Sequence, residues 1–153
     1  MRSEPPDPLD LDAFLPYRLS VLANRTSRAL ARTYASKFDL TIPEWRVMAV
    51  LGQAPGLSAD EVAARTQMDK VTVSRAVARL LDKDYVDRGI SERDRRRSVL
   101  RLSRRGNGVY ARIIPMARKF DREFCAGLSH ADREGLFELL EKLDAAVASL
   151  NGG

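Results

Sequence analysis

The chain has 153 residues, of which 44% are hydrophobic and 31% are charged, a composition typical of one compact domain or two small lobes sharing a core. Its net charge of +5 is concentrated, because residues 88–105 carry eight arginines against two acidic residues and the rest sums to −1. One cysteine and one histidine argue against a disulfide, a zinc site and a Ser–His or Cys–His catalytic pair.

These limits exclude several classes of protein. No apolar run is long enough to span a bilayer, and the acidic, proline-rich start MRSEPPDPLDLD has no apolar signal core, so we expect a cytoplasmic protein. An enzyme is not expected, because the sequence offers no general-base cluster, metal-ligand set or glycine-rich phosphate loop. We therefore expect no metal and no other cofactor.

The chain begins with a predicted flexible arm and a long helix. Residues 1–11 contain three of the seven prolines, which is typical of a flexible segment. Residues 12–38 have the apolar periodicity of a helix, with Pro16 in or near its first turn, where proline is tolerated.

Three capping signals follow within 30 residues. Thr41 and Ser58 each begin a capping box, and these predict a helix to about Gln53 and a short helix over 58–66. Asp69 then caps a helix over 70–84. Two short helices joined by a tight turn are typical of a helix-turn-helix.

A β-hairpin and two more helices complete the chain. Residues 85–88 and 98–103 are strand candidates, and in the second strand Val99 and Arg101 should face away from Leu100 and Leu102. Ser103 caps a helix to about residue 125, with a kink expected at Pro115. Ser129 begins a last helix, whose apolar stripe consists of Leu136, Leu139, Leu140, Leu143 and Val147. We therefore predict a mainly α fold with a small β-hairpin wing (α+β), organised as a winged helix-turn-helix with a helical dimerisation region.

The helix after Asp69 is the candidate for DNA reading. Val73, Val77 and Leu80 follow the spacing of a core stripe, which leaves short polar and basic side chains for the major groove of DNA. These candidate DNA contacts are Lys70, Thr72, Ser74, Arg75 and Arg79.

The hairpin loop is the second candidate DNA contact. Arg95, Arg96 and Arg97 can enter a minor groove, where narrow DNA concentrates negative potential. Asp94 would repel phosphate, so we interpret it as an internal brace whose carboxylate pairs with the Arg96 guanidinium and fixes its direction.

Residues 94–106, DRRRSVLRLSRRG, resemble the D-x-R-x-x-x-L-x-L-[ST]-x-x-G signature of the MarR family of bacterial transcription regulators at every fixed position. The order of predicted elements is similar to that family from about Asp12 to Leu150. The resemblance implies a winged-helix homodimer in which residues 12–40 and 107–150 form the dimerisation helices and residues 41–106 bind double-stranded, palindromic operator DNA.

The resemblance also implies a small ligand. Members commonly sense aromatic or phenolic compounds between the dimerisation helices and the DNA-binding lobe, so we expect a repressor released by an aromatic acid or its acyl thioester. A cationic group beside aromatic walls suits such a ligand, although Trp45 and Met48 also fit plain core packing. The candidate ligand contacts are Tyr17, Arg18, Val21, Arg25, Trp45 and Met48.

Two alternatives stay open from sequence. A peroxide-sensing repressor would need a reactive cysteine, but Cys125 lies late in its helix, where a packed, inert thiol is the simpler interpretation. A non-specific architectural DNA-binding protein would need the basic residues but not a shaped recognition helix.

Overall fold

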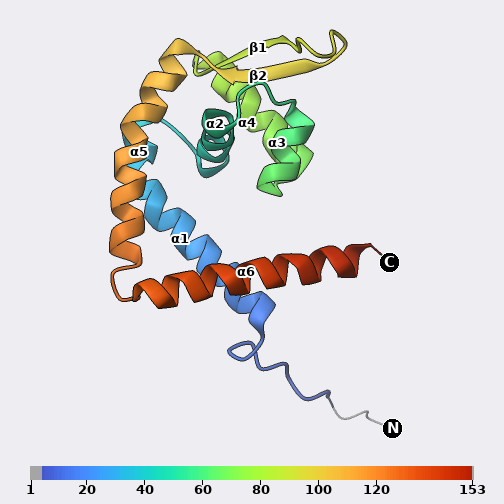
Figure 1. Ribbon diagram of the computed structural model, residues 1–153, viewed down its shortest axis with the longest axis vertical. Coiled ribbons are helices and arrows are strands. Elements are labelled where there is room, and N and C mark those ends of the chain that lie inside the picture. Colours follow the sequence, from blue (N-terminus) through green and yellow to red (C-terminus); the bar gives the residue numbers. More distant parts are fainter. Residues whose placement is uncertain (1–4, 153) are drawn as a thin grey trace. The chain divides into compact units, whose positions relative to one another are not determined.

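The computed structural model describes residues 5–152, which form six helices and one antiparallel hairpin (Figure 1). The elements in chain order are α1 (Leu15–Phe38), α2 (Ile42–Gln53), α3 (Ala59–Thr66), α4 (Lys70–Asp82), β1 (Val86–Ile90), β2 (Ser98–Leu102), α5 (Arg104–Phe124) and α6 (His130–Asn151). This confirms the mainly helical α+β fold with a β-hairpin. The chain forms two compact units, Met1–Met116 and Ala117–Gly153.

The helix starts are set by local capping, as predicted. In each case a side-chain oxygen accepts the backbone N–H of the residue three positions later, which satisfies one of the free donors of the first turn. The residues that cap in this way are Thr41, Ser58, Asp69, Ser103 and Ser129.

The start of α1 differs from the prediction by three residues. Residues 10–13 form a turn, in which the Ala13 N–H donates to the Asp10 carbonyl at 3.2 Å, and the helix begins at Leu15. Residues 5–10 have no helix or strand, as expected for the arm, and residues 1–4 of that predicted arm lie outside the described residues. The helix ends where Asp39 adopts a left-handed conformation with φ of 54°.

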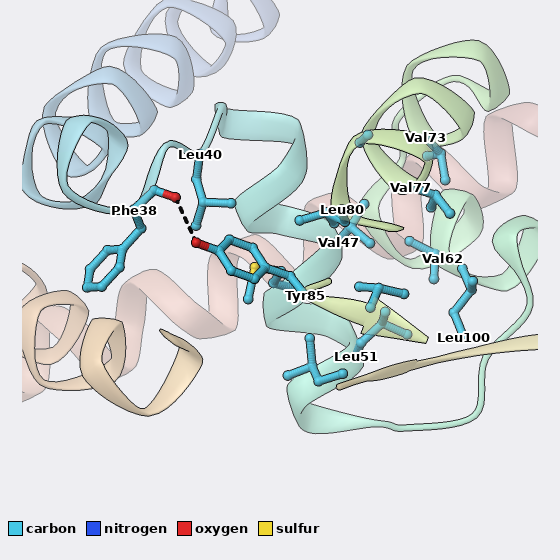
Figure 2. Packing of buried hydrophobic residues seen from close by; sticks show 14 of the residues in the cluster. Phe38, Leu40, Val47, Leu51, Val62, Val73, Val77, Leu80, Tyr85 and Leu100 are labelled. Atoms are coloured by element: carbon cyan, nitrogen blue, oxygen red, sulfur yellow. Dashed lines mark hydrogen bonds between the residues drawn. The ribbon is translucent and has the colours of Figure 1, made fainter. Parts of the chain in front are cut away.

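The hydrophobic core lies in the first unit and joins α1–α4, the hairpin and the start of α5. Val62 of α3 and Val73, Val77 and Leu80 of α4 point into the same cluster (Figure 2), and each is at most 2% exposed. The predicted core stripe of α4 is therefore confirmed. Burial of this stripe fixes which face of α4 is left for a partner.

The hairpin has one more partner than the sequence predicted. β1 and β2 pair with Val86 opposite Leu102 and Ile90 opposite Ser98, and Leu57 forms an isolated bridge to Leu100. Val99 was expected on the face opposite Leu100, and both residues are buried. The strand is therefore covered at this point, where the residues before α3 run along its outer edge.

A close approach joins α5 to the hairpin. A Cβ atom at Gly106 would lie 1.9 Å from the Tyr85 carbonyl oxygen, so glycine is required at this position. Ser103 stands beside it and donates its hydroxyl to the Asp84 carbonyl while it caps α5. Close packing against Tyr85 therefore explains why the signature of residues 94–106 ends in glycine.

A buried ion pair connects the first turn of α2 to Lys83, the residue that follows α4. Glu44 is fully buried, and its Oε1 lies 3.1 Å from Lys83 Nζ, which also donates to the Asp39 carbonyl. Tyr85 donates its hydroxyl to the Phe38 carbonyl at 3.2 Å (Figure 2). Burial alone raises the pKa of Glu44, but hydrogen bonds from Thr41 and the Lys83 ammonium outweigh it and lower the pKa below its usual value.

The second unit contains the end of α5 and all of α6. Arg133 pairs with Asp121 at 2.8 Å, and the rings of Phe120 and Phe124 are stacked with centroids 5.8 Å apart. Across its whole length, His130–Asn151, α6 has no buried side chain. Among the helices of residues 5–152, none has an apolar stretch long enough to cross a lipid bilayer.

Candidate nucleic-acid interface

The helix-turn-helix consists of α3 and α4, joined by residues 67–69. Gln67 ends α3 in a left-handed conformation with φ of 56°, and Asp69 then caps α4. Thr72 donates both its N–H and its hydroxyl to the Asp69 carboxylate, each at 2.7 Å, and these bonds lower the pKa of Asp69. The hydroxyl of Thr72, a predicted DNA contact, is therefore already engaged within the cap.

The face of α4 opposite the core is open. Ser74, Arg75 and Arg79 are exposed on it, as the sequence predicted. Lys70 is also exposed and lies 3.5 Å from Asp60 at the start of α3, an ion pair of two well-solvated side chains that adds little to stability. The same face carries the exposed Val71, which is not among the predicted DNA contacts.

A cleft borders this face. It has a volume of about 310 Å³ and lies between the start of α2 and the exposed side of α4. Its lining residues are Thr41, Pro43, Thr72, Arg75, Ala76 and Arg79. Two arginines beside a helix N-terminus give this cleft a positive potential, which suits a phosphate group.

The wing loop covers residues 91–97 and is held by backbone contacts of its own. Asp94 Oδ1 accepts the backbone N–H of Arg96 at 3.0 Å, and the Asp94 carbonyl accepts that of Arg97 at 3.0 Å. The predicted ion pair between Asp94 and the Arg96 guanidinium is not formed, because the short carboxylate is turned to the loop backbone. Asp94 therefore stabilises the backbone of the loop, and its carboxylate does not hold the exposed guanidinium of Arg96.

Arg97 links the wing to α3. Its Nη2 lies 2.9 Å from Glu61 Oε1 and 3.1 Å from Ser58 Oγ, and Glu61 Oε2 meanwhile accepts the Ser58 N–H at 2.9 Å. The Ser58 N–H and, to a smaller degree, Arg97 lower the pKa of Glu61. All three arginines predicted at the tip are exposed, but Arg97 is held by its contact with α3. The sequence did not point to the Arg97–Glu61 contact, since the two residues are 36 positions apart.

The six predicted ligand contacts do not all come together within this chain. Trp45 packs between Tyr34 and Tyr110, at centroid distances of 5.5 and 6.0 Å. Tyr17 precedes Tyr34 by 17 positions on α1, which is about 25 Å along a helix. Met48 is fully buried in the core.

The other predicted ligand contacts lie along α1. Arg18 is exposed and donates to the Asp12 carbonyl at 3.1 Å, Val21 is half-buried and Arg25 is exposed. Burial raises the pKa of Tyr34 to about 12, so its phenol stays neutral beside Trp45.

A cavity of about 220 Å³ does lie between α1 and α2. It is lined by Asn24, Ser27, Arg28, Ile42 and Arg46. Arg46 is held there by a 2.8 Å hydrogen bond from its Nη2 to Ser27 Oγ. Two guanidinium groups and no carboxylate line this cavity, which favours an anionic occupant.

Cys125, the basis of the peroxide-sensing alternative, follows the end of α5. It is half-buried, and its Sγ lies 3.9 Å from Asp121 Oδ1.

Known proteins with similar sequences and folds are transcription regulators. A model of the MarR family matches residues 38–97. A regulatory protein for the hcr operon of Thauera aromatica is 32% identical over 116 residues, which cover 76% of this chain and 70% of the relative.

Two solved structures are similar over nearly the whole chain. A MarR/EmrR family regulator from Acinetobacter sp. ADP1 has a TM-score of 0.85 and 26% identity, covering 92% of this chain and 99% of its own. PcaV from Streptomyces coelicolor, solved in complex with its natural ligand, has a TM-score of 0.76 and 26% identity over the same shares.

Proposed function

This chain belongs to the MarR family of DNA-binding transcription regulators and is not an enzyme, and we propose that it is a homodimeric repressor released from a palindromic operator by a small aromatic acid. The observation that carries the DNA-reading part is the face of α4 opposite the core. This face is exposed, bears Ser74, Arg75 and Arg79, and is followed in the chain by an arginine-rich wing. A partner in this role is chromosomal DNA, so the cytoplasmic location expected from the sequence is part of the proposal.

In the proposed complex, α4 enters the major groove and the wing enters the adjacent minor groove. Arg75 reads a base edge, Lys70, Ser74 and Arg79 support it, and Arg95 and Arg96 contact the minor groove. Asp94 and Arg97 hold the loop that presents these two arginines, as their contacts indicate. Thr72 acts through the Asp69 cap, because its hydroxyl is engaged there.

The proposal of a homodimer rests on uncovered apolar surface. Both α1 and α6 are long amphipathic helices whose large apolar side chains are exposed. A large exposed apolar surface is typical of an interface between proteins. The residues involved are Leu15, Leu19, Leu22, Leu136, Phe137, Leu139, Leu140 and Val147. We assign residues 12–40 and 107–150 to dimerisation, residues 41–106 to DNA binding, and residues 1–11 to an arm.

For the ligand, the cavity between α1 and α2 supports an anionic aromatic compound more than the six residues predicted from sequence. Arg28 and Arg46 can pair with a carboxylate, and Trp45, on the same helix as Arg46, stands in an aromatic cluster. PcaV, a relative of similar fold, has a natural ligand. Aromatic acids and their acyl thioesters are the compounds to test first, and Tyr17, Arg18, Val21 and Arg25 remain candidates in the dimer.

The test begins with selection of bound duplexes from a randomised pool, followed by fluorescence anisotropy on the selected and scrambled duplexes across a salt series. An inverted repeat with half-site centres about 10 base pairs apart is expected, because two recognition helices meet successive major grooves. Binding without sequence preference would instead indicate an architectural protein. Release by peroxide that Cys125→Ser abolishes would indicate the cysteine switch.

The ligand is tested in the same assay by titrating benzoate-type acids and their thioesters into the complex. Arg46→Ala should retain operator binding and lose the response to the acid. Arg65→Ala, on the exposed side of α3, is the matched control and should keep the response. Equal responses of both variants would remove the cavity from the proposal.

A further inference from the structure

Val71 is an apolar side chain at the centre of the face that α4 leaves open. Val73, Val77 and Leu80 are buried, and the positions on the opposite side of the helix are 71, 74, 75 and 78. Val71 is 59% exposed, in the first turn of α4, one turn before Arg75. Nothing in its own protomer covers most of this side chain.

An exposed valine has no local reason to stand at this position. Valine has a lower helix propensity than the alanine, lysine or glutamate that suit a solvated helix surface. The start of α4 is already secured by the Asp69 cap, so Val71 adds no hydrogen bond to it. Val71 is therefore available to a partner that covers the first turn of α4.

The chemistry of the major groove supplies an apolar partner. Each base pair presents donors and acceptors there, and thymine alone adds an apolar group, its C5-methyl. The open face of α4 carries a methyl-bearing Val71, then Ser74 and Arg75, then the exposed Ala78. Val71 can therefore make an apolar contact in the groove, while Arg75, one turn further along α4, can bind guanine.

We propose that Val71 is a specificity-determining residue that contacts the C5-methyl group of a thymine in each operator half-site. The inference rests on the proposed function, since α4 must be the helix that enters the major groove. It adds to that function a preference for thymine at one position, read by burial of methyl groups and not by hydrogen bonds.

The test uses the full chain and the duplex selected from a randomised pool. Each thymine is replaced in turn by deoxyuridine, which lacks only the C5-methyl group. The wild-type protein should lose about fourfold in affinity at one position of a half-site, and roughly 15-fold when both half-sites are changed, from burial of one methyl group per site. The other thymines should show no such effect.

The Val71→Ala variant tests whether Val71 itself makes the contact with the methyl group. It should bind the thymine operator more weakly than the wild type, and deoxyuridine at the sensitive position should cause no further loss. Alanine favours the helix, so a weakened variant is not an unfolded one, and its affinity for scrambled duplex should equal that of the wild type. Ile90→Ala removes a 68% exposed apolar side chain of the hairpin and is the matched control, expected to keep the full deoxyuridine effect.

The possible outcomes distinguish a failure of this inference from a failure of the proposed function. If Val71→Ala keeps the wild-type loss on deoxyuridine, or if no thymine is sensitive, Val71 does not read a methyl group. In that case Arg75→Ala still lowers discrimination between operator and scrambled DNA if the proposed function is right. If neither variant changes discrimination, base reading is left to Lys70 and Arg79, and the proposal that Val71 reads a methyl group fails.

Discussion

α4 and α6 are both amphipathic, but the apolar stripe of α4 is buried and that of α6 is not. The stripe of α4 is covered within the chain, with Val73, Val77 and Leu80 at most 2% exposed, whereas α6 has no buried side chain. The open surface of α4 is polar and basic, apart from Val71 and Ala78, and the open surface of α6 is rich in leucine. The difference teaches that one amphipathic pattern serves two purposes: the covered stripe stabilises the fold, and the character of the uncovered face indicates the partner.

The largest effect is expected from charges on the open stripe of α6. Replacing Leu139 and Val147, which are 57% and 56% exposed, with aspartate should raise the dimer dissociation constant at least about 100-fold, since an interface would bury unpaired charges. Sedimentation equilibrium measures this, and circular dichroism should show an intact helical signal. The matched control is His130→Gln, at the exposed start of the same helix. A dimer that survives the double aspartate change would end the assignment of α6 to the interface.

The covered stripe of α4 should respond through folding instead. Leu80 is fully buried, so Leu80→Ala should lower the free energy of unfolding by about 2–5 kcal/mol through lost burial and a residual cavity. Urea denaturation at two protein concentrations distinguishes a core residue from an interface residue, because only the effect of an interface residue depends on protein concentration. If Leu139→Ala lowers the free energy of unfolding as much as Leu80→Ala at every concentration, the stripe of α6 is covered within the chain and not by a second copy.

The ion pair at the end of α4 should give a smaller, pH-dependent effect. Lys83→Met leaves the buried Glu44 carboxylate unpaired and should cost about 3 kcal/mol at neutral pH, the lower end for a buried pair because the Lys83 side chain is 24% exposed. The pKa of Glu44 is lowered by folding, so its contribution is full above the unfolded pKa and is lost as pH falls through the folded one.

Urea denaturation between pH 7 and pH 3 measures this effect. The difference between Lys83→Met and the wild type should shrink toward acid, where Glu44 takes up a proton. Lys142→Met, on the exposed surface of α6, is the control and should show no such trend. A difference that stays constant with pH would contradict the role of this ion pair.

The open face of α4 should respond in specificity. Arg75→Ala should cost about 1–3 kcal/mol on the operator and much less on scrambled duplex, because a base contact is lost. Arg104→Ala, at the exposed start of α5, is the matched change: it should lower both affinities in proportion and reduce the salt dependence by about one counterion. Fluorescence anisotropy across a salt series measures both. Full discrimination in Arg75→Ala would move base reading to Lys70 or Arg79.

The smallest effect is expected in the wing. Asp94→Ala removes a negative charge from a DNA-facing loop, yet it should weaken operator binding by about 0.5–1.5 kcal/mol, because the hydrogen bond that shapes the loop is lost. Asp94→Asn keeps an acceptor oxygen and should bind at least as tightly as the wild type. Tighter binding by Asp94→Ala would show that charge, and not loop shape, dominates the wing.

The sequence by itself determined the local structure. The caps at Thr41, Ser58, Asp69 and Ser129 set helix starts within a residue, because their donors and acceptors lie three positions apart in the chain. Apolar periodicity identified the covered stripe of α4, and the signature of residues 94–106 identified the family. Val71 was also within reach, since an apolar residue out of phase with that stripe must be exposed.

Only the tertiary structure decided which distant groups meet. The Arg97–Glu61 and Lys83–Glu44 pairs join residues 36 and 39 positions apart, and no local pattern specifies such a contact. Val99 is buried where the chain before α3 passes beside β2, through a bridge between Leu57 and Leu100. Side-chain pairing across a fold depends on how its elements pack, and that packing is a property of the whole core.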